Sequence, residues 1–280
     1  MKQPRPQQLA FALLLPIMLV NLAAFLAPML NLATLSLHRA LPGGGIGPLS
    51  PATWTGLLTD RFYAELALRS IGVALLVTLL TLLASYPLAL FVHRADPRWR
   101  NLLVVLCISP LLVSAVVRTY GWLVILGVGG VLPTSLRAIG WSNPPRLLFN
   151  LTGVVIGLVE IIMPYMILSL LAGFGRLDRN LEDAAATLGA PPGRMFLRII
   201  LPLSLPGVVL GCLLSFVLTL SSFITPKLLG GGRVILLATE IYDQAIVTLN
   251  WPLAAALSVV VLLVFGAALL AYGRIAKAVA

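Results

Sequence analysis

Long apolar runs alternate with short polar segments along the whole chain. Six of these runs reach about 20 residues, the length that an α-helix needs to cross the hydrocarbon core of a bilayer. Such a pattern predicts an all-α polytopic membrane protein, with residues 1–280 forming a single transmembrane domain. The six spans are expected near Leu9–Leu35, Ser70–Val92, Leu102–Leu126, Leu147–Ala172, Leu205–Ile224 and Pro252–Tyr272.

The segment Asn180–Pro206 is polar in an otherwise apolar chain. Its first half has the features of a short helix. Asn180 is a good N-cap, and Asp183 follows three residues later in a variant of the capping box. Glu182 and Asp183 place negative charge in the first turn, where the helix dipole favours it. Gly189 suits the C-cap.

Prolines bound the second half of this segment. Pro191 and Pro192 forbid continuation of the first helix, because proline has no backbone N–H and clashes with the preceding turn. A second short helix is expected over Pro192–Leu201, and Pro202 is expected to end it. The segment therefore predicts a helix, a break and a second helix between two membrane spans.

Small and sulfur-containing residues occur within the apolar runs. Gly153 with Gly157, and Gly207 with Gly211, form GxxxG pairs, which allow close helix packing in membranes. Two cysteines, Cys107 and Cys212, also lie in apolar runs. We expect them to be buried thiols rather than a disulfide or a metal site.

Composition excludes a soluble protein. Hydrophobic residues make up 60% of the 280 residues and charged residues only 10%, against about 25% charged in soluble domains. The net charge of +10 is spread over the loops rather than clustered, so membrane topology explains it better than nucleic-acid binding.

Lysine and arginine positions indicate the orientation, since cytoplasmic loops carry an excess of both. This bias places both termini and Asn180–Pro206 in the cytoplasm. The connection His38–Arg69 then lies outside, with an irregular segment that begins at Pro42–Gly45. Eleven basic residues lie at one set of ends: Lys2, Arg5, Arg94, Arg98, Arg100, Arg176, Arg179, Arg194, Arg198, Arg274 and Lys277. Seven lie at the other: Arg39, Arg61, Arg69, Arg137, Arg146, Lys227 and Arg233.

The polar segment resembles the EAA loop of ABC importer permeases of the MetI-like fold. The family pattern is an acidic residue, two alanines, a glycine and then Ile-x-Leu-Pro, and every spacing fits, with aspartate in place of the usual glutamate. The resemblance implies that residues 173–204, here called the coupling loop, dock on a separate ATPase subunit. The residues implied in docking are Glu182, Asp183, Ala184, Ala185, Gly189, Ile199, Leu201 and Pro202.

Two further stretches resemble permeases of the spermidine/putrescine type. One is Arg-Thr-Tyr-Gly-Trp at Arg118–Trp122, where relatives have alanine in place of Gly121. The other is the order Ser221–Pro226, Leu228–Gly231, Ile241 with Tyr242, and Asn250–Leu253. Relatives often have an acidic residue just before the phenylalanine, at the place of Ser222. The resemblance implies a polyamine cargo, and Ser222 weakens that implication.

Glu160 is the only acidic residue within a predicted span. A carboxyl at this depth is by default a functional-site hypothesis, although it could also be a hydrogen-bonded structural group. Counted along straight helices, Glu160 lies about 20 Å from the outer end and Arg118 about 24 Å from the inner end, so a direct ion pair is not assured. Candidate pathway residues are Arg118, Tyr120, Trp122, Glu160, Tyr165, Ser222 and Phe223.

The sequence contains no Gly-x-x-x-x-Gly-Lys-Ser/Thr phosphate-binding segment. We therefore expect no catalysis and no cofactor in this chain, with ATP and Mg held by two partner ATPase subunits. A second permease (or a copy of this chain) and an extracytoplasmic binding protein complete the partners that the resemblance implies. The expected location is a bacterial inner membrane.

Other functions remain open. Within the same architecture the cargo could be an amino-acid derivative, a phosphonate or ferric iron, and Arg118 would favour an anionic group. A channel or secondary transporter should show inverted repeats or more intramembrane ionisable groups, and a membrane enzyme should show a catalytic cluster within the spans. Neither feature is evident in the sequence.

Overall fold

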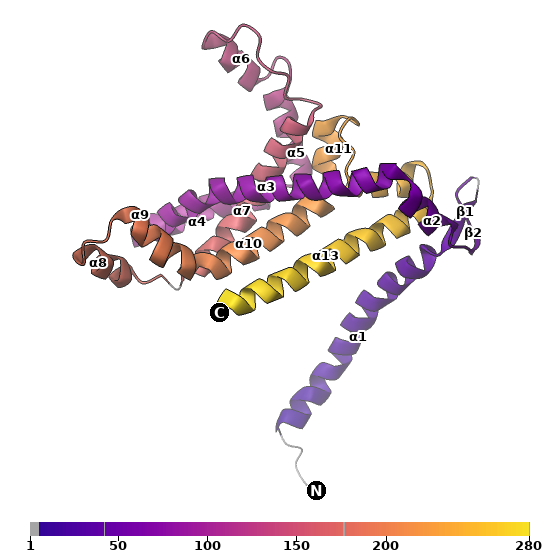
Figure 1. Cartoon of the computed structure of the whole chain (residues 1–280), viewed down its shortest axis with the longest axis horizontal. Helices are drawn as coiled ribbons and strands as arrows, with labels where there is room; N and C mark the ends of the chain where they lie inside the picture. Colours follow the sequence, from indigo (N-terminus) through magenta and orange to yellow (C-terminus); the bar gives the residue numbers. More distant parts are fainter. Residues whose placement is uncertain (1–5, 42, 176, 280) are drawn as a thin grey trace. The chain divides into compact units, whose positions relative to one another are not determined.

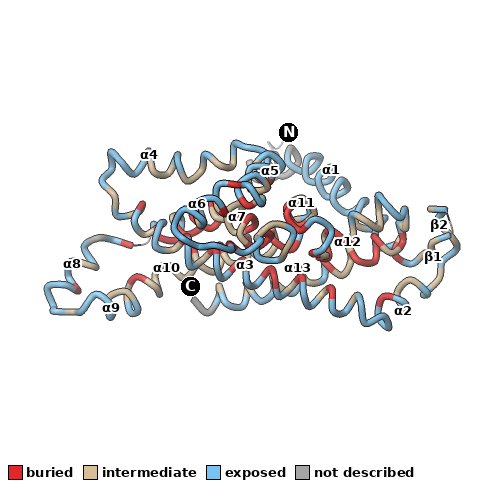
Figure 2. The backbone as a smooth tube through the Cα atoms, turned by 90° about the horizontal axis from the view of Figure 1, so that it is seen from above, coloured by how far each residue is buried: buried red, intermediate tan, exposed pale blue. Residues whose placement is uncertain are grey.

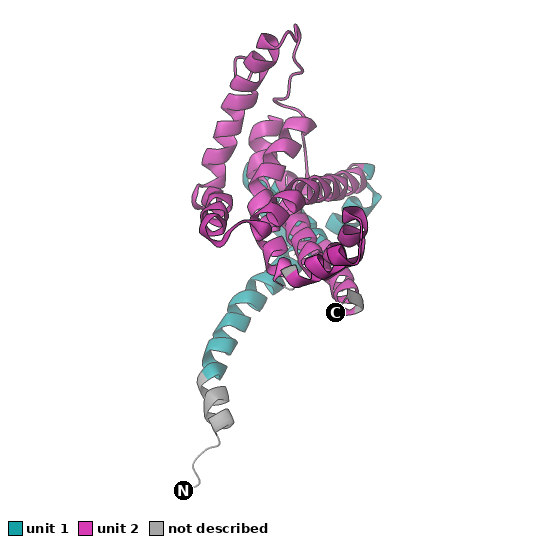
Figure 3. Cartoon of the chain, turned by 90° about the vertical axis from the view of Figure 1, so that its left-hand side faces the viewer, with its two compact units in different colours: residues 1–61, 241–262 teal, residues 62–240, 263–280 magenta. Residues whose placement is uncertain are grey.

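A computed structural model describes residues 6–41, 43–175 and 177–279 of the chain. Lys2, Arg5 and Arg176, which contributed to the predicted orientation, lie outside these residues. The chain forms two compact units, residues 1–61 with 241–262 and residues 62–240 with 263–280 (Figure 3). Each unit is described by itself.

The first unit contains one long helix and a small hairpin. Helix α1 (Pro6–Leu35) is exposed at every side chain described from Leu14 to Leu32 except the half-buried Met29, as its pale blue course in Figure 2 shows. Strands β1 (His38–Leu41) and β2 (Gly45–Leu49) pair antiparallel, with His38 opposite Leu49 and Leu41 opposite Gly45. The prediction of an irregular segment that begins at Pro42–Gly45 was wrong from Gly45 onward, because Gly45–Leu49 forms β2 and Ala52–Thr59 forms a helix; Pro42 lies outside the described residues.

Short helices complete the first unit. Helix α2 (Ala52–Thr59) is tied to the hairpin by the Thr53 hydroxyl, which donates to the His38 carbonyl at 2.7 Å. The π turn Asp243–Val247 and the first half of α13 (Trp251–Val279) also belong to this unit.

Helices are the only regular secondary structure among the described residues of the second unit. Its long helices are α3 (Arg61–Arg94), α7 (Leu151–Phe174) and α10 (Leu201–Ser221), which run alongside one another in Figure 1. Its shorter helices are α4 (Pro97–Ile108), α5 (Ala115–Leu126), α6 (Val131–Ala138), α8 (Arg179–Thr187), α9 (Pro192–Met195), α11 (Ile224–Gly230) and α12 (Leu237–Tyr242).

Helix α7 forms the centre of the second unit. Half or more of its residues are buried, including Val154, Leu158, Met166, Leu170 and Phe174. Near its start they pack against α3 and α11, and near its end against α3 and α10. A helix that is apolar on all sides and buried to this extent lies in the core of its unit.

Helices α7 and α10 approach one another at the backbone. A Cβ added at Gly207 would lie 2.7 Å from the Ser169 carbonyl oxygen and 2.8 Å from the Gly173 Cα. One at Gly211 would lie 2.5 Å from the Met166 sulfur. The GxxxG pair Gly207 and Gly211 therefore serves packing, as expected.

Six helical segments among the described residues are long and apolar enough to cross a membrane, which confirms the predicted number. They are Leu14–Leu35, Arg61–Arg94, Ala115–Ala138, Leu151–Phe174, Pro192–Ser221 and Trp251–Lys277.

The third predicted span, Leu102–Leu126, was wrong as a single helix. The chain forms α4, a 3₁₀ turn at Ser109–Leu112 and then α5, with Val113 and Ser114 extended between them. Pro110 lies in this turn and has no N–H to continue the α-helical ladder, which explains the break.

Replacing Gly207 by alanine should force α7 and α10 apart. We expect the Gly207→Ala chain to melt at a lower temperature than the Gly72→Ala chain, a difference of about 1–3 kcal/mol in stability. Gly72 is the matched control, because it is an exposed helical glycine whose added Cβ would meet nothing within 4 Å. Equal melting temperatures for the two purified chains in detergent would contradict the close contact.

Candidate functional site

The first helix of the coupling loop has an N-cap residue that differs from the prediction. Helix α8 starts at Arg179, and its N-cap is Asp178, whose Oδ1 accepts a hydrogen bond from the Asn180 N–H at 3.0 Å. The prediction of Asn180 as N-cap, with Asp183 completing a capping box, was therefore wrong by two residues. Both residue types can accept from unpaired N–H groups in the first turn of a helix, and aspartate adds a charge that the helix dipole favours.

The end of α8 matches the prediction. Gly189 has φ +76°, and its N–H donates to the Ala186 carbonyl at 2.9 Å, while the Ala190 N–H donates to the Ala185 carbonyl at 3.0 Å. These two bonds form a Schellman motif, in which the left-handed residue is usually glycine. Gly189 thus ends the helix and turns the chain back toward α9.

The second helix of the coupling loop does not end at Pro202. Helix α9 continues through a π turn at Phe196–Ile200 into α10, and Pro202 lies in the first turn of α10. The Leu201 N–H bonds to the Phe196 carbonyl, five residues back. This wider turn redistributes the hydrogen bonds next to the proline, so the prediction that Pro202 closes the helix was wrong.

Three contacts hold the loop against the long helices. The Arg94 Nη2 forms an ion pair with the Glu182 Oε2 at 2.7 Å, joining the end of α3 to α8. Leu177 and Ile200 are buried at the two ends of the loop in one apolar cluster with Phe174. Because Arg94 is 42% exposed, the ion pair positions α8 more than it stabilises the fold.

The opposite face of the loop is uncovered. In the second unit α8 and α9 lie at one end of the α3, α7 and α10 bundle (Figure 1). Leu188 exposes 87% of its surface and Leu197 exposes 63%, and Asp183 and Ala184 are also exposed. Of the other predicted docking residues, Ala185 is buried, Glu182, Ile199 and Leu201 are half-buried, and Pro202 is exposed.

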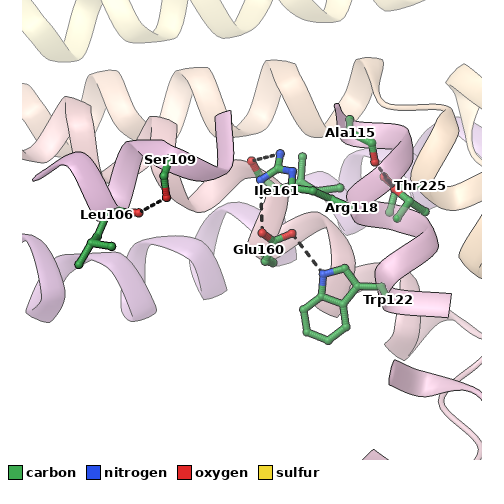
Figure 4. A network of polar contacts seen from close by, with 9 residues as sticks. Leu106, Ser109, Ala115, Arg118, Trp122, Glu160, Ile161 and Thr225 are labelled. Atoms are coloured by element: carbon green, nitrogen blue, oxygen red, sulfur yellow. Dashed lines mark hydrogen bonds and ion pairs between the residues drawn. The ribbon is translucent and has the colours of Figure 1, made fainter. Parts of the chain in front are cut away.

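Glu160 is the centre of a second group of polar residues, here called the Glu160 cluster and made of Arg118, Trp122 and Glu160. Arg118 Nη1 lies 3.3 Å from Glu160 Oε1, and Trp122 Nε1 donates to Glu160 Oε2 at 3.2 Å. Figure 4 shows the carboxylate between the guanidinium and the indole. Arg118 Nη2 also donates to the Ile161 carbonyl at 3.4 Å.

The ion pair corrects the depth estimate made from the sequence. That estimate placed Arg118 and Glu160 at different depths because it counted Leu102–Leu126 as one straight helix. The break at Ser109–Ser114 instead starts a new helix, and Arg118 and Trp122 face α7 one turn apart on α5. Paired and hydrogen-bonded in this way, two charged groups can lie within a membrane span.

The other predicted pathway residues do not join this cluster. Among the described residues, no hydrogen bond to the Glu160 carboxylate comes from Tyr120, Tyr165 or Ser222. Tyr120, Tyr165 and Phe223 expose 54%, 38% and 37% of their surfaces. The structure therefore brings together three of the seven predicted residues.

Glu160 also borders an apolar cavity of about 370 Å³. Its walls come from α3, α4 and α7, and Glu160 is the one charged residue among those that line it. The apolar lining residues include Leu88, Leu103, Leu106, Met163 and Ile167. Such a cavity suits an apolar chain that carries a positive charge at the carboxylate end.

Two pairs of hydroxyl groups that join helices of the second unit were not predicted from the sequence. The Thr119 and Thr225 hydroxyls lie 3.1 Å apart and join α5 to α11, and the Tyr86 and Ser204 hydroxyls lie 2.9 Å apart and join α3 to α10. Isolated hydroxyls in apolar runs are a weak signal, because each one can also bond to its own helix. No group of three or more metal-ligating side chains occurs among the described residues.

Comparison with known proteins identifies the family. Residues 85–279 match the model of the binding-protein-dependent transport system inner membrane component. The chain belongs to this family. The chain is also 36% identical over 213 residues to the spermidine/putrescine transport system permease protein PotB of Haemophilus influenzae, covering 76% of this chain and 74% of that protein.

Two solved structures share the fold. A chain of a bacterial alginate ABC transporter, in complex with a periplasmic protein bound to an alginate pentasaccharide, covers 96% of both chains with a TM-score of 0.74 and 19% identity. A chain of the MetNI methionine ABC transporter in an inward-facing conformation covers 79% of this chain and 100% of its own, with a TM-score of 0.57 and 15% identity. With the family and the six apolar helices, they confirm a MetI-like permease fold in a multi-pass inner membrane protein.

The Glu160 cluster predicts energetic coupling between its members. We expect Arg118→Gln and Glu160→Gln each to destabilise the chain, and the double variant to lose less than the sum, with a coupling of about 0.5–3 kcal/mol. Unfolding in detergent gives the four free energies needed, those of the wild-type chain, the two single variants and the double variant. Glu160→Gln combined with Tyr165→Phe is the matched control and should be additive. Additivity in the Arg118 cycle would mean that the ion pair does not form.

Proposed function

We propose that this chain is the transmembrane permease subunit of an ATP-driven ABC importer that carries a polyamine, such as spermidine or putrescine, into the cytoplasm. The observation that carries the proposal is the 36% identity to a spermidine/putrescine permease over three quarters of the chain. In this proposal residues 1–280 act as one permease domain, and the chain itself catalyses no reaction.

The coupling loop is the proposed contact with the ATPase. Its support is a set of uncovered apolar side chains on the loop: Leu181 on α8, Leu188 just after it and Leu197 in the π turn expose 45%, 87% and 63% of their surfaces. Several exposed large apolar side chains on one polar segment are a feature of protein interaction sites when they form a patch. ATP and Mg would be held by two ATPase subunits, and a second permease and an extracytoplasmic binding protein would complete the assembly.

The contacts of the loop support a mechanical role. The loop is attached to α3, α7 and α10 by Arg94, Leu177 and Ile200, so a force on α8 is carried to α3 and α7, which border the Glu160 cavity. Alternating access then takes the form of rigid movement of this helix group between inward-facing and outward-facing states. Both termini and the coupling loop lie in the cytoplasm in this proposal, as the basic residues favour.

The Glu160 cavity supports a cationic cargo. Glu160 is 33% exposed whereas its partner Arg118 is 11% exposed, so an entering solute reaches the carboxylate first. A polyamine has ammonium groups joined by methylene chains, which match one carboxylate beside an apolar wall. Four side chains of the proposed pathway offer aromatic faces for cation–π contact: Trp122, Tyr120, Tyr165 and Phe223. Ser222 contributes a hydroxyl.

One observation favours a different small solute within the same architecture. The Arg118 Nε is buried and has no hydrogen-bond partner among the described residues. An anionic group on the cargo would satisfy this donor and compete with Glu160 for the guanidinium. Uptake measurements with a cationic and with an anionic solute therefore distinguish the two classes of cargo.

The cargo prediction concerns Glu160. In proteoliposomes that contain the assembled transporter, Glu160→Gln should lower the kcat/KM for labelled spermidine uptake about tenfold or more, as loss of a charge-assisted bond costs about 1.5–3 kcal/mol. Tyr120→Phe, which removes only an exposed hydroxyl, is the comparison variant. Unchanged spermidine kinetics in Glu160→Gln, or wild-type uptake of an anion but not of spermidine, would contradict a polyamine pathway through this residue.

The coupling prediction concerns Gly189. Alanine at φ +76° costs about 1–2 kcal/mol and disturbs the Schellman motif, so Gly189→Ala should reduce uptake and ATP hydrolysis of the assembled transporter several-fold. Gly140→Ala is the matched control, because Gly140 has φ +98° and both glycines have open space at the Cβ position. If both variants lose activity equally while remaining in the membrane, general backbone strain is responsible and the loop has no special role.

A further inference from the structure

Three arginines line one pocket at the end of α7 opposite to the coupling loop. Arg137 comes from α6, Arg146 from the segment before α7, and Arg233 from the segment after α11. The pocket has a volume of about 280 Å³, and the apolar side chains of Leu126 and Leu148 complete part of its wall. Helix α7 begins beside this pocket and ends at the coupling loop, about 36 Å away along its 24 residues.

The backbone around the pocket is fixed by specific contacts. The Phe149 N–H donates to the Leu229 carbonyl at 2.9 Å, which joins the segment before α7 to α11. Gly231 has φ +54°, and a Cβ there would lie 2.2 Å from the Phe149 ring, so glycine is required for this approach. The Asn150 side chain bonds to the Arg146 carbonyl and caps α7 by accepting from the Gly153 N–H at 2.9 Å.

The pocket carries positive charge without an internal counter-ion. No aspartate or glutamate lines it, and none occurs in the sequence between residues 126 and 149 or between 228 and 239. Within the described residues, the three guanidinium groups form no ion pair or hydrogen bond. Arginines converging on one small volume repel each other unless an anion binds between them, and planar guanidinium groups are suited to phosphate oxygens.

The surroundings of the pocket indicate a lipid headgroup. Helix α7 is long and apolar enough to cross a membrane, and it begins at Leu151, directly after the pocket residues Leu148 and Phe149, so the pocket lies where this span meets the interface. The flanking side chains Val131, Ile139 and Trp141 expose 65%, 83% and 56% of their surfaces. Exposed apolar and tryptophan side chains beside arginine are typical of a segment that lies in the headgroup region.

We propose that this arginine pocket binds the phosphate of an anionic phospholipid in the leaflet opposite to the coupling loop. The proposal explains why three of the seven basic residues assigned to that side lie together, where the positive-inside tendency disfavours them. It is independent of the cargo and of ATPase docking. A bound lipid would tie α6 to the loops before α7 and after α11.

Lipid binding to the full-length chain in detergent, measured by native mass spectrometry, tests this site. The probes are phosphatidylglycerol and phosphatidylcholine with identical acyl chains. We expect a preference for phosphatidylglycerol, which Arg137→Gln, Arg146→Gln and Arg233→Gln each weaken about fivefold and the triple variant removes. Arg39→Gln, an exposed arginine in the hairpin, should leave the preference unchanged. All three pocket arginines are exposed, so melting temperatures should not change.

Several results would overturn the proposal. The first is equal binding of the two lipids by the wild-type chain, and the second is an unchanged preference in the triple variant. Displacement of phosphatidylglycerol by inorganic phosphate at comparable concentration would assign the pocket to a free anion instead. A triple variant that keeps its lipid preference but no longer associates with an acidic binding protein would assign the pocket to a protein surface.

Discussion

The contact between α7 and α10 is the constraint on which the second unit depends. Gly173 and Gly207 bring the two backbones together, and the neighbouring Ser169 carbonyl leaves no room for a side chain at Gly207. Gly173 is the penultimate residue of α7, and Gly207 lies in the second turn of α10. The coupling loop leaves one of these helices and enters the other, so the contact fixes both of its ends.

This arrangement gives the loop a rigid base and an uncovered tip. Leu177 and Ile200 continue the apolar cluster of α7 into the loop, and the ion pair of Arg94 with Glu182 fixes α8 beside α3. Beyond these contacts Leu188 is almost fully exposed. In the proposed mechanism, a segment held firmly at its base and exposed at its tip would transmit a push from a partner to the helices.

The sequence predicted the elements that depend on hydrophobicity and on single conformational requirements. The six apolar runs give six spans because the bilayer imposes a length and an apolar composition on each. Gly189 was predicted as a helix end because few other residues adopt its backbone conformation.

Features that depend on competition between neighbouring residues were not predictable in the same way. Asp178 and Asn180 are both good caps, and only the start of α8 decides between them. Pro202 normally ends a helix, yet a π turn before it lets the helix continue. The ion pair of Arg118 with Glu160 depends on the break near Pro110. Counting depth along one straight helix places these two residues apart, whereas the new helix that starts after the break brings them together.

In the proposed assembly the exposed tip of the coupling loop lies against the ATPase. A photoreactive amino acid at position 188, in the assembled transporter, measures this contact directly. We expect a cross-link from position 188 to the ATPase subunit, and none from position 139, where Ile139 is similarly exposed at the end of α6. A cross-link from position 188 only to lipid or to the extracytoplasmic binding protein, with none to the ATPase, would contradict it.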